Sequence, residues 1–150
     1  MTTFVDTNVL AYAFDRTDAD KQAIASAQLE ALWFDRSGVL STQILQEFYA
    51  VATHQLKLAM TPAEARQVVQ LYAQWPVVVI EPALILTAST IHERHQVSFW
   101  DALVLQAAKV AGADRLLTED LQHGRVIEGV RIENPFVSRE AGGEPPISDG

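Results

Sequence analysis

The sequence predicts an α/β domain with three α/β/α layers, in which helices cover both faces of a mainly parallel central sheet. Short apolar runs alternate with longer segments of helical periodicity between residues 2 and 132. This alternation is typical of parallel strands joined by helical crossovers. The runs at 4–5, 39–40 and 77–80 are wholly apolar, as expected for strands that are covered on both faces.

Capping residues and helix breakers set the boundaries of the predicted elements. The clearest helix start is T-P-A-E at 61–64, with Thr at the N-cap, Pro at the first helical position and Glu at the third. Gly112 is the expected C-cap of the last helix. In chain order we expect a strand over 2–5, helices over 8–14 and 19–36, a strand over 39–41, helices over 42–58 and 62–74, a strand over 77–80, helices over 82–94 and 99–110, and strands over 115–118 and 126–132.

The length and composition indicate one globular domain. At 150 residues and 49% hydrophobic content the chain can bury a sizeable core. We expect this domain to span 1–137, and the tail over 138–150, rich in Gly, Pro, Ser and acidic residues, to be disordered. No membrane-length apolar run or signal peptide is visible. The lack of cysteine excludes disulfides and thiolate metal sites and is compatible with the cytoplasmic location that we expect.

The charge of the chain bears on its possible partners. The formal net charge is -8 and the pI is about 4.8, whereas nucleic-acid binders usually carry a basic surface. Clustered carboxylates that bind metal ions contribute negative charge that the ions offset. The acidic balance therefore does not exclude a metal-dependent enzyme that acts on nucleic acid.

Two acidic residues follow predicted strands. Asp6 comes directly after the strand over 2–5, and Asp120 follows the strand over 115–118. In open α/β sheets, ligands bind outside the carboxyl ends of the strands. Each residue also has a structural interpretation, since Asp is a good N-cap and a common turn residue. For Asp6 alone, a helix cap and a metal ligand are equally supported.

Two further acidic residues lie on helices beside apolar positions. On a helical wheel Glu47 falls about 40° from Val51 and about 60° from Ile44, at the edge of a stripe that we expect to be buried. A Glu there either reaches solvent or needs a partner. Asp101 is the third residue after the N-cap candidate Ser98, in a helix that is apolar nearly all round. It can complete a capping box and still present an oxygen to a metal.

Together the four carboxylates predict a divalent-metal site. Mg²⁺ takes one or two direct carboxylates and completes its shell with waters and substrate phosphates. Such sites activate a water and stabilise charge on a phosphate during in-line displacement. Other chemistries have weaker support: His92 and His95 lack the spacing of a zinc-binding H-E-x-x-H motif, and no Gly-rich phosphate loop or G-x-S-x-G motif occurs.

The sequence resembles the PIN-domain ribonucleases, most closely the VapC-like toxins of type II toxin–antitoxin pairs. The similarity extends from residue 3 to about residue 136. It rests on five segments in order: V-D-T-N-V-L-A-Y at 5–12, Q-E-F-Y at 46–49, S-F-W-D-A-L-V-L-Q-A-A at 98–108, L-L-T-E-D-L at 116–121 and G-V-R-I-E-N-P-F at 129–136. The resemblance implies a PIN-like form of the three-layer fold.

The same resemblance implies a function and a set of site residues. Proteins of this family cleave single-stranded RNA with Mg²⁺ or Mn²⁺ held by an acidic quartet, form homodimers, and are blocked by a cognate antitoxin protein. Carried over by motif, Asn8 and Thr118 would be supporting polar residues, and Glu119 a possible extra acid at the rim. The implied metal and catalytic residues are Asp6, Glu47, Asp101 and Asp120.

Two other functions stay open at this point. One is a PIN-fold module that binds RNA or protein without cutting, and the other is a structure-specific DNA nuclease with the same metal chemistry. Within the nuclease hypothesis, Asp6 and Asp101 are expected to be the main metal ligands. Glu47 and Asp120 would complete the site directly or through water.

Overall fold

The computed structural model describes residues 1–54 and 56–137, so the predicted tail over 138–150 lies outside the described residues. Its centre is a six-stranded sheet in the order β3-β2-β1-β4-β6-β5. All neighbouring strands pair in parallel except β5 and β6, which are antiparallel. The strands are β1 (Thr3–Val5), β2 (Gly38–Ser41), β3 (Val77–Val78), β4 (Arg115–Leu117), β5 (Val126–Ile127) and β6 (Val130–Glu133).

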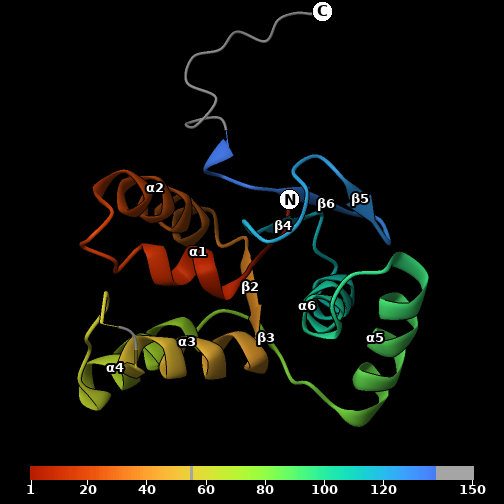
Figure 1. The fold of residues 1–150 in the computed structure, drawn as a ribbon, viewed down its shortest axis with the longest axis horizontal. Coiled ribbons are helices and arrows are strands. Elements are labelled where there is room, and N and C mark those ends of the chain that lie inside the picture. The colour runs from red at the N-terminus through yellow and green to blue at the C-terminus, as the bar shows by residue number, and fades with distance from the viewer. Residues whose placement is uncertain (55, 138–150) are drawn as a thin grey trace, which may run out of the picture.

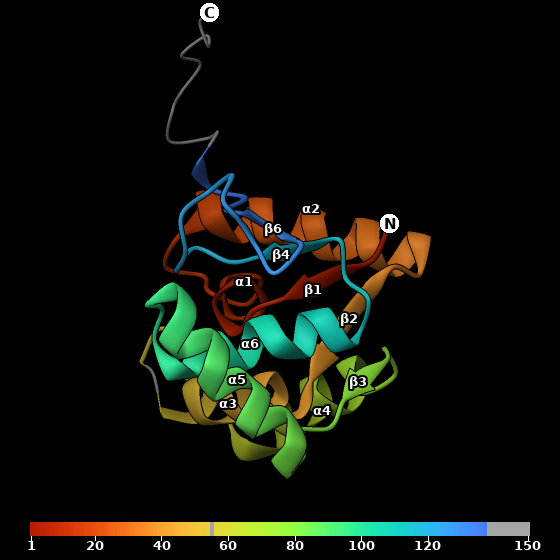
Figure 2. The same ribbon diagram turned by 90° about the vertical axis from the view of Figure 1, so that its right-hand side faces the viewer.

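Helices lie on both sides of the sheet and complete the three-layer α/β/α fold (Figure 1). In Figure 2, α2 lies above the central strands and α6 lies below them, with α5 beside α6. Among the described residues, no helix combines the length and apolarity needed to cross a membrane. The helices are α1 (Thr7–Tyr12), α2 (Ala19–Asp35), α3 (Thr42–His54), α4 (Pro62–Tyr72), α5 (Pro82–His95) and α6 (Phe99–Val110).

Strand β1 holds the central position that fixes the site. It pairs with β2 on one side and β4 on the other, and Phe4 and Val5 are fully buried. The ladder continues one residue past β1, because the backbone N–H of Asp6 donates to the carbonyl of Leu117 at 3.0 Å. The carboxyl ends of β1 and β4 therefore meet at the same edge of the sheet, as the alternating pattern predicts.

The segment over 126–132 departs from the prediction of a single edge strand. It forms a β-hairpin in which β5 and β6 are joined by Glu128 and Gly129, whose φ values are 52° and 83°. Tight hairpin turns of this kind need positive φ at both central residues. Glu rarely takes the first of these positions, so the sequence lacks the usual Asn-Gly or Asp-Gly signal.

Several predicted boundaries and caps also differ from those observed. The strand expected over 77–80 contains only Val77–Val78, which lie half-buried at the sheet edge, while Val79 is 58% exposed. Helix α3 ends at His54 and does not continue to 58. Helix α6 has its C-cap at Ala111, and Gly112 follows it with a φ of 72°. Glycine thus takes the left-handed position just after the cap.

An aromatic cluster covers the start of β2. The ring of Trp75 lies 5.4 Å from that of Trp33 and 5.0 Å from that of Tyr72, measured between centroids. A Cβ atom added at Gly38 would lie 2.5 Å from the Trp75 ring. Because the two neighbouring rings hold Trp75 in place, the chain has no room for a side chain at Gly38.

We predict that Gly38→Ala lowers the free energy of unfolding by about 1–3 kcal/mol, the usual cost of overpacking a core. Urea unfolding followed by circular dichroism measures this change. In a Trp75→Leu background the same substitution should cost less, because the ring that causes the clash is gone. Equal losses in the two backgrounds would show that contact with Trp75 is not the cause.

Candidate metal centre

Asp6 is the buried acid at the centre of the candidate site. Its side chain is positioned at the end of β1, and the residue is only 5% exposed. One carboxylate oxygen, Oδ1, accepts from the backbone N–H of Thr7 at 2.8 Å and so caps α1. The other oxygen, Oδ2, accepts from Thr118 Oγ1 at 2.8 Å. The capping interpretation is therefore correct, yet it occupies only one of the two oxygens.

Three of the four predicted acids converge. Asp6, Asp101 and Asp120 each present one carboxylate oxygen, and these oxygens all lie within 4.8 Å of one another. They come from the end of β1, the first turn of α6 and the loop after β4. Ser98 caps α6 by accepting from the backbone N–H of Asp101 at 3.0 Å, which fixes the turn that carries this carboxylate.

Glu47, the fourth predicted acid, is not a member of this group of converging oxygens. Its Oε1 accepts from Thr7 Oγ1 at 2.7 Å, and its Oε2 accepts from Gln43 Nε2 at 3.1 Å. Glu47 is half-buried on α3 and lines the same cavity as Asp6 and Asp120. The expectation of a position at the edge of the buried stripe is therefore correct, while the partners of its oxygens are hydrogen-bond donors of the protein.

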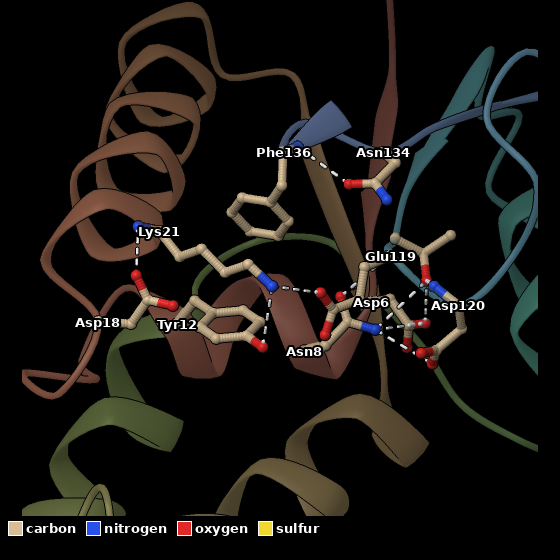
Figure 3. Close-up of polar contacts among 10 residues, drawn as sticks. Asp6, Asn8, Tyr12, Asp18, Lys21, Glu119, Asp120, Asn134 and Phe136 are labelled. Atoms are coloured by element: carbon tan, nitrogen blue, oxygen red, sulfur yellow. Dashed lines mark hydrogen bonds and ion pairs between the residues drawn. The ribbon is translucent and has the colours of Figure 1, made fainter. Parts of the chain in front are cut away.

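The two predicted supporting residues, Asn8 and Thr118, connect the acids. Figure 3 shows Asn8 between Asp6 and Asp120. The amide Nδ2 of Asn8 lies 3.1 Å from Asp120 Oδ2, 3.3 Å from Thr118 Oγ1 and 3.5 Å from Asp6 Oδ2. Thr118, which is fully buried, also accepts from the backbone N–H of Asp120 at 3.0 Å. One amide and one hydroxyl thus hold the carboxylates of Asp6 and Asp120 near each other.

Glu119 does not extend the acidic group. Figure 3 shows its carboxylate reaching toward Lys21, whose Nζ lies 3.0 Å from Glu119 Oε1. The same ammonium lies 3.3 Å from Tyr12 Oη and over the rings of Tyr12 and Phe136. Sequence reasoning missed Lys21, because no local pattern links residue 21 on α2 with a loop acid about a hundred positions later.

Burial and mutual repulsion shape the electrostatics of the site. Burial raises the pKa of Asp6 to about 7, although hydrogen bonds from Thr118 and Thr7 oppose this, and the charges of Asp120 and Glu47 add to it. Burial also raises the pKa of Asp101 and that of Asp120, and the charge of Glu47 contributes to both. A cation placed among these oxygens would relieve both effects.

The site opens into a cavity of about 440 Å³ between α1, α3 and the loop after β4. Its donor set consists of carboxylate oxygens with no thiolate or imidazole, which suits hard divalent cations such as Mg²⁺ and Mn²⁺. The acidic residues that line it are Asp6, Asp15, Glu47, Glu119 and Asp120. The open side leaves room for a substrate phosphate beside a bound cation.

A comparison with protein families identifies the class of this protein. The family profile of the PIN domain matches residues 3–128. The chain therefore belongs to the PIN domain family. This family match and the three-layer fold agree with the resemblance inferred from the five sequence segments.

Solved structures with the same fold include toxins. The chain is similar to VapC20 of Mycobacterium tuberculosis, a sarcin–ricin loop cleaving toxin, with 21% identity, a TM-score of 0.61, and coverage of 79% of this chain and 92% of that one. A toxin–antitoxin complex from Klebsiella pneumoniae has 17% identity, a TM-score of 0.66, and coverage of 89% and 98%. FitAcB of Neisseria gonorrhoeae has 18% identity, a TM-score of 0.64, and coverage of 90% and 99%.

These identities are low, so the structural similarity demonstrates a shared fold. No curated protein sequence matches the chain. What this site does is therefore inferred from its own geometry and from the family to which the chain belongs.

We predict that Asp6→Asn stabilises the metal-free protein at pH 8 but not at pH 4. The pKa of Asp6 is raised in the folded state, so the folded state binds more protons than the unfolded state between about pH 4 and 7. Stability should therefore fall as the pH rises through this window. A rise of the pKa from 3.8 to about 7 corresponds to about 4 kcal/mol, an upper bound for the gain.

Urea unfolding in EDTA at a series of pH values measures this effect. Asp35→Asn is a matched control, because Asp35 is an exposed residue at the end of α2. If the stability difference between wild type and Asp6→Asn does not change between pH 4 and pH 8, burial does not raise the pKa of this carboxyl.

Proposed function

We propose that this protein is a metal-dependent endoribonuclease that hydrolyses phosphodiester bonds in RNA and serves as the toxin of a toxin–antitoxin pair. One observation carries the proposal: oxygens of Asp6, Asp101 and Asp120 lie within 4.8 Å of one another at the open edge of the sheet. Membership of the PIN domain family and the toxins among the similar structures support it.

The residues take different roles in this proposal. Asp6 and Asp101 are the main ligands of Mg²⁺ or Mn²⁺, and Asp120 is the third acid of the group. Glu47 contributes negative charge and acts on the cation through water, because the group of converging oxygens consists of those of Asp6, Asp101 and Asp120. Asn8 and Thr118 hold the carboxylates of Asp6 and Asp120 in place.

A divalent cation in this site would activate water for attack and stabilise the negative charge that builds up on the phosphate. The chain supplies the remaining parts of the reaction. Asp6 stays at a fixed position because Thr7 and Thr118 both donate to it. The cavity beside the acids admits the RNA strand. Attack of water on phosphorus breaks one P–O bond, and the leaving oxygen takes up a proton.

The partners follow from the proposed role as a toxin. An antitoxin protein would block the site, and two copies of the chain would form a homodimer in the cytoplasm. Similar structures include toxin–antitoxin complexes, some of them bound to DNA. A small upstream reading frame for a DNA-binding protein beside this one would support the antitoxin.

We predict that the purified protein cleaves single-stranded RNA with Mg²⁺ or Mn²⁺ and not in EDTA. Asp6→Asn and Asp101→Asn should each lower kcat/KM by about 100-fold or more. Even the loss of a residue that only orients a metal ligand typically lowers metal affinity or activity about 10- to 100-fold. Asp35→Asn, far from the cavity, should cut like wild type.

Two results would redirect this proposal. Full cleavage by both variants would rule out the metal mechanism. Calorimetry without Mg²⁺ or Mn²⁺ uptake by the wild-type chain would favour the alternative, a non-catalytic module that binds RNA or protein. Digestion of single-stranded DNA beside RNA separates an RNase from a DNA nuclease.

We also predict that induced expression of the chain arrests bacterial growth, because a toxin of this class depletes an essential RNA. Expression of Asp6→Asn at the same level should leave growth unaffected. Growth curves and immunoblots of the two cultures measure this. If growth stays normal although the wild-type enzyme cleaves RNA, the nuclease function is supported and the toxin role is contradicted.

A further inference from the structure

Trp100 is a large apolar side chain that the described fold leaves open. It is 64% exposed, whereas Trp75 is 7% exposed and Trp33 packs against Trp75 and Tyr72. Tryptophan is highly buried on average in folded proteins. An indole that is this exposed to solvent is therefore a candidate contact for a binding partner.

Its place in the fold puts the ring beside the acidic group. Trp100 directly precedes Asp101, whose oxygen converges with those of Asp6 and Asp120. Consecutive Cα atoms are about 3.8 Å apart. Both residues lie in the first turn of α6, and helical side chains lean toward the N-terminus of their helix. Trp100 is therefore one residue away from a carboxylate of the acidic group, within reach of a nucleotide next to a phosphate bound there.

Two contacts hold Trp100 in position. Its ring packs edge-to-face on Phe99, with centroids 5.5 Å apart and an interplanar angle of 70°. Its backbone carbonyl accepts from Gln43 Nε2 at 3.4 Å, and the same amide nitrogen donates to Glu47. The contact with Phe99 restrains the ring, and the hydrogen bond ties the backbone of Trp100 to the residues around Glu47. A restrained ring loses less conformational entropy when a ligand stacks on it.

The charges around the site indicate which ligand fits. Among the described residues that line the cavity, Lys57 is the one cation beside five acids. Further cations of the chain are neutralised in ion pairs: Lys21 by Glu119, Arg94 and Lys109 by Glu128, and Arg115 and Arg131 by Glu133. Contacts between lysine or arginine and phosphate supply most of the affinity of ordinary nucleic-acid binders. Among the described residues the cavity has one cation, so contacts of other kinds gain importance for affinity.

Stacking on an aromatic ring supplies affinity that does not depend on charge. Unpaired bases stack on exposed aromatic side chains, and each such contact contributes a substantial share of the binding free energy. A base in a duplex is already stacked and cannot use the ring. An exposed indole next to an acidic, metal-binding edge therefore suits a strand whose bases are unpaired.

We propose that Trp100 is a stacking platform for an unpaired nucleobase of the RNA strand that is cut at the carboxylates. This inference rests on the proposed nuclease function and deepens it. It names the residue that would hold an unpaired base beside the scissile phosphate.

Intrinsic fluorescence tests the proposal, because Trp100 is the most exposed of the three tryptophans. The Asp6→Asn chain, which is expected to cut poorly, is titrated with an unlabelled single-stranded RNA and with the same strand in a duplex. The single strand should change the emission of Trp100 and shield it from iodide quenching, and the duplex should do so much less. The same titration of Trp100→Leu in this background should give no such change.

Affinity measurements complete the test. By fluorescence anisotropy with labelled RNA, Trp100→Leu should bind the single strand about fivefold or more weakly, while Trp100→Tyr, which keeps a stacking ring, should recover most of the affinity. Phe34→Leu is the matched control, because Phe34 is 89% exposed at the far end of α2. In the otherwise wild-type chain, Trp100→Leu should raise KM and leave Mn²⁺ affinity, measured by calorimetry, unchanged.

Three results would overturn the proposal. If Trp100→Leu binds RNA as tightly as its parent while the wild-type chain cleaves RNA, the stacking role is contradicted and the nuclease function is not. Dissociation of a dimer by Trp100→Leu, with RNA affinity per chain unchanged, would assign the ring to an interface between copies. A wild-type chain that neither binds nor cuts RNA would overturn both this inference and the proposed function.

Discussion

The burial of one carboxylate at the end of the central strand is the constraint on which the rest of this structure depends. Removing an ionised carboxylate from water is costly unless hydrogen bonds or a cation compensate. Asp6 receives hydrogen bonds from Thr7 and Thr118, yet its pKa still lies at about 7. The hydrogen bonds therefore compensate only part of the cost of burying the ionised carboxylate. A scaffold that keeps this charge in place is prepared for a cation before the cation arrives.

The direction in which each carboxylate points then distinguishes the acids around the cavity. Six acidic residues lie at or near the cavity, but they are not equivalent. Glu119 forms an ion pair with Lys21, and Glu47 accepts hydrogen bonds from Thr7 and Gln43. Asp15 accepts a hydrogen bond from the backbone N–H of Thr17. The remaining three, Asp6, Asp101 and Asp120, have oxygens that converge. A count of nearby carboxylates therefore exceeds the number whose oxygens converge.

The parts predictable from sequence are those governed by local rules. Alternating periodicity gave the parallel sheet, and it placed Asp6 and Asp120 at one edge because carboxyl ends of parallel strands meet there. The capping pattern located Asp101. The remaining features depend on contacts between distant segments. The ion pair of Lys21 with Glu119 and the hydrogen bonds of Glu47 have no local signature in the sequence. The hairpin was not predicted because Glu128 adopts a left-handed backbone conformation that Glu rarely takes.

Several basic residues of this acidic chain form ion pairs within the fold. The carboxylate of Glu128 accepts from Lys109, His95 and Arg94, which hold its pKa down to about 2. These three side chains join the hairpin to α5 and α6, so they contribute to holding the fold together. A protein that uses its basic residues in this way gains little from long-range attraction to a polyanion. If the chain is the proposed nuclease, its selectivity for RNA would then arise at short range, from a cation held by the carboxylates and from contacts with unpaired bases.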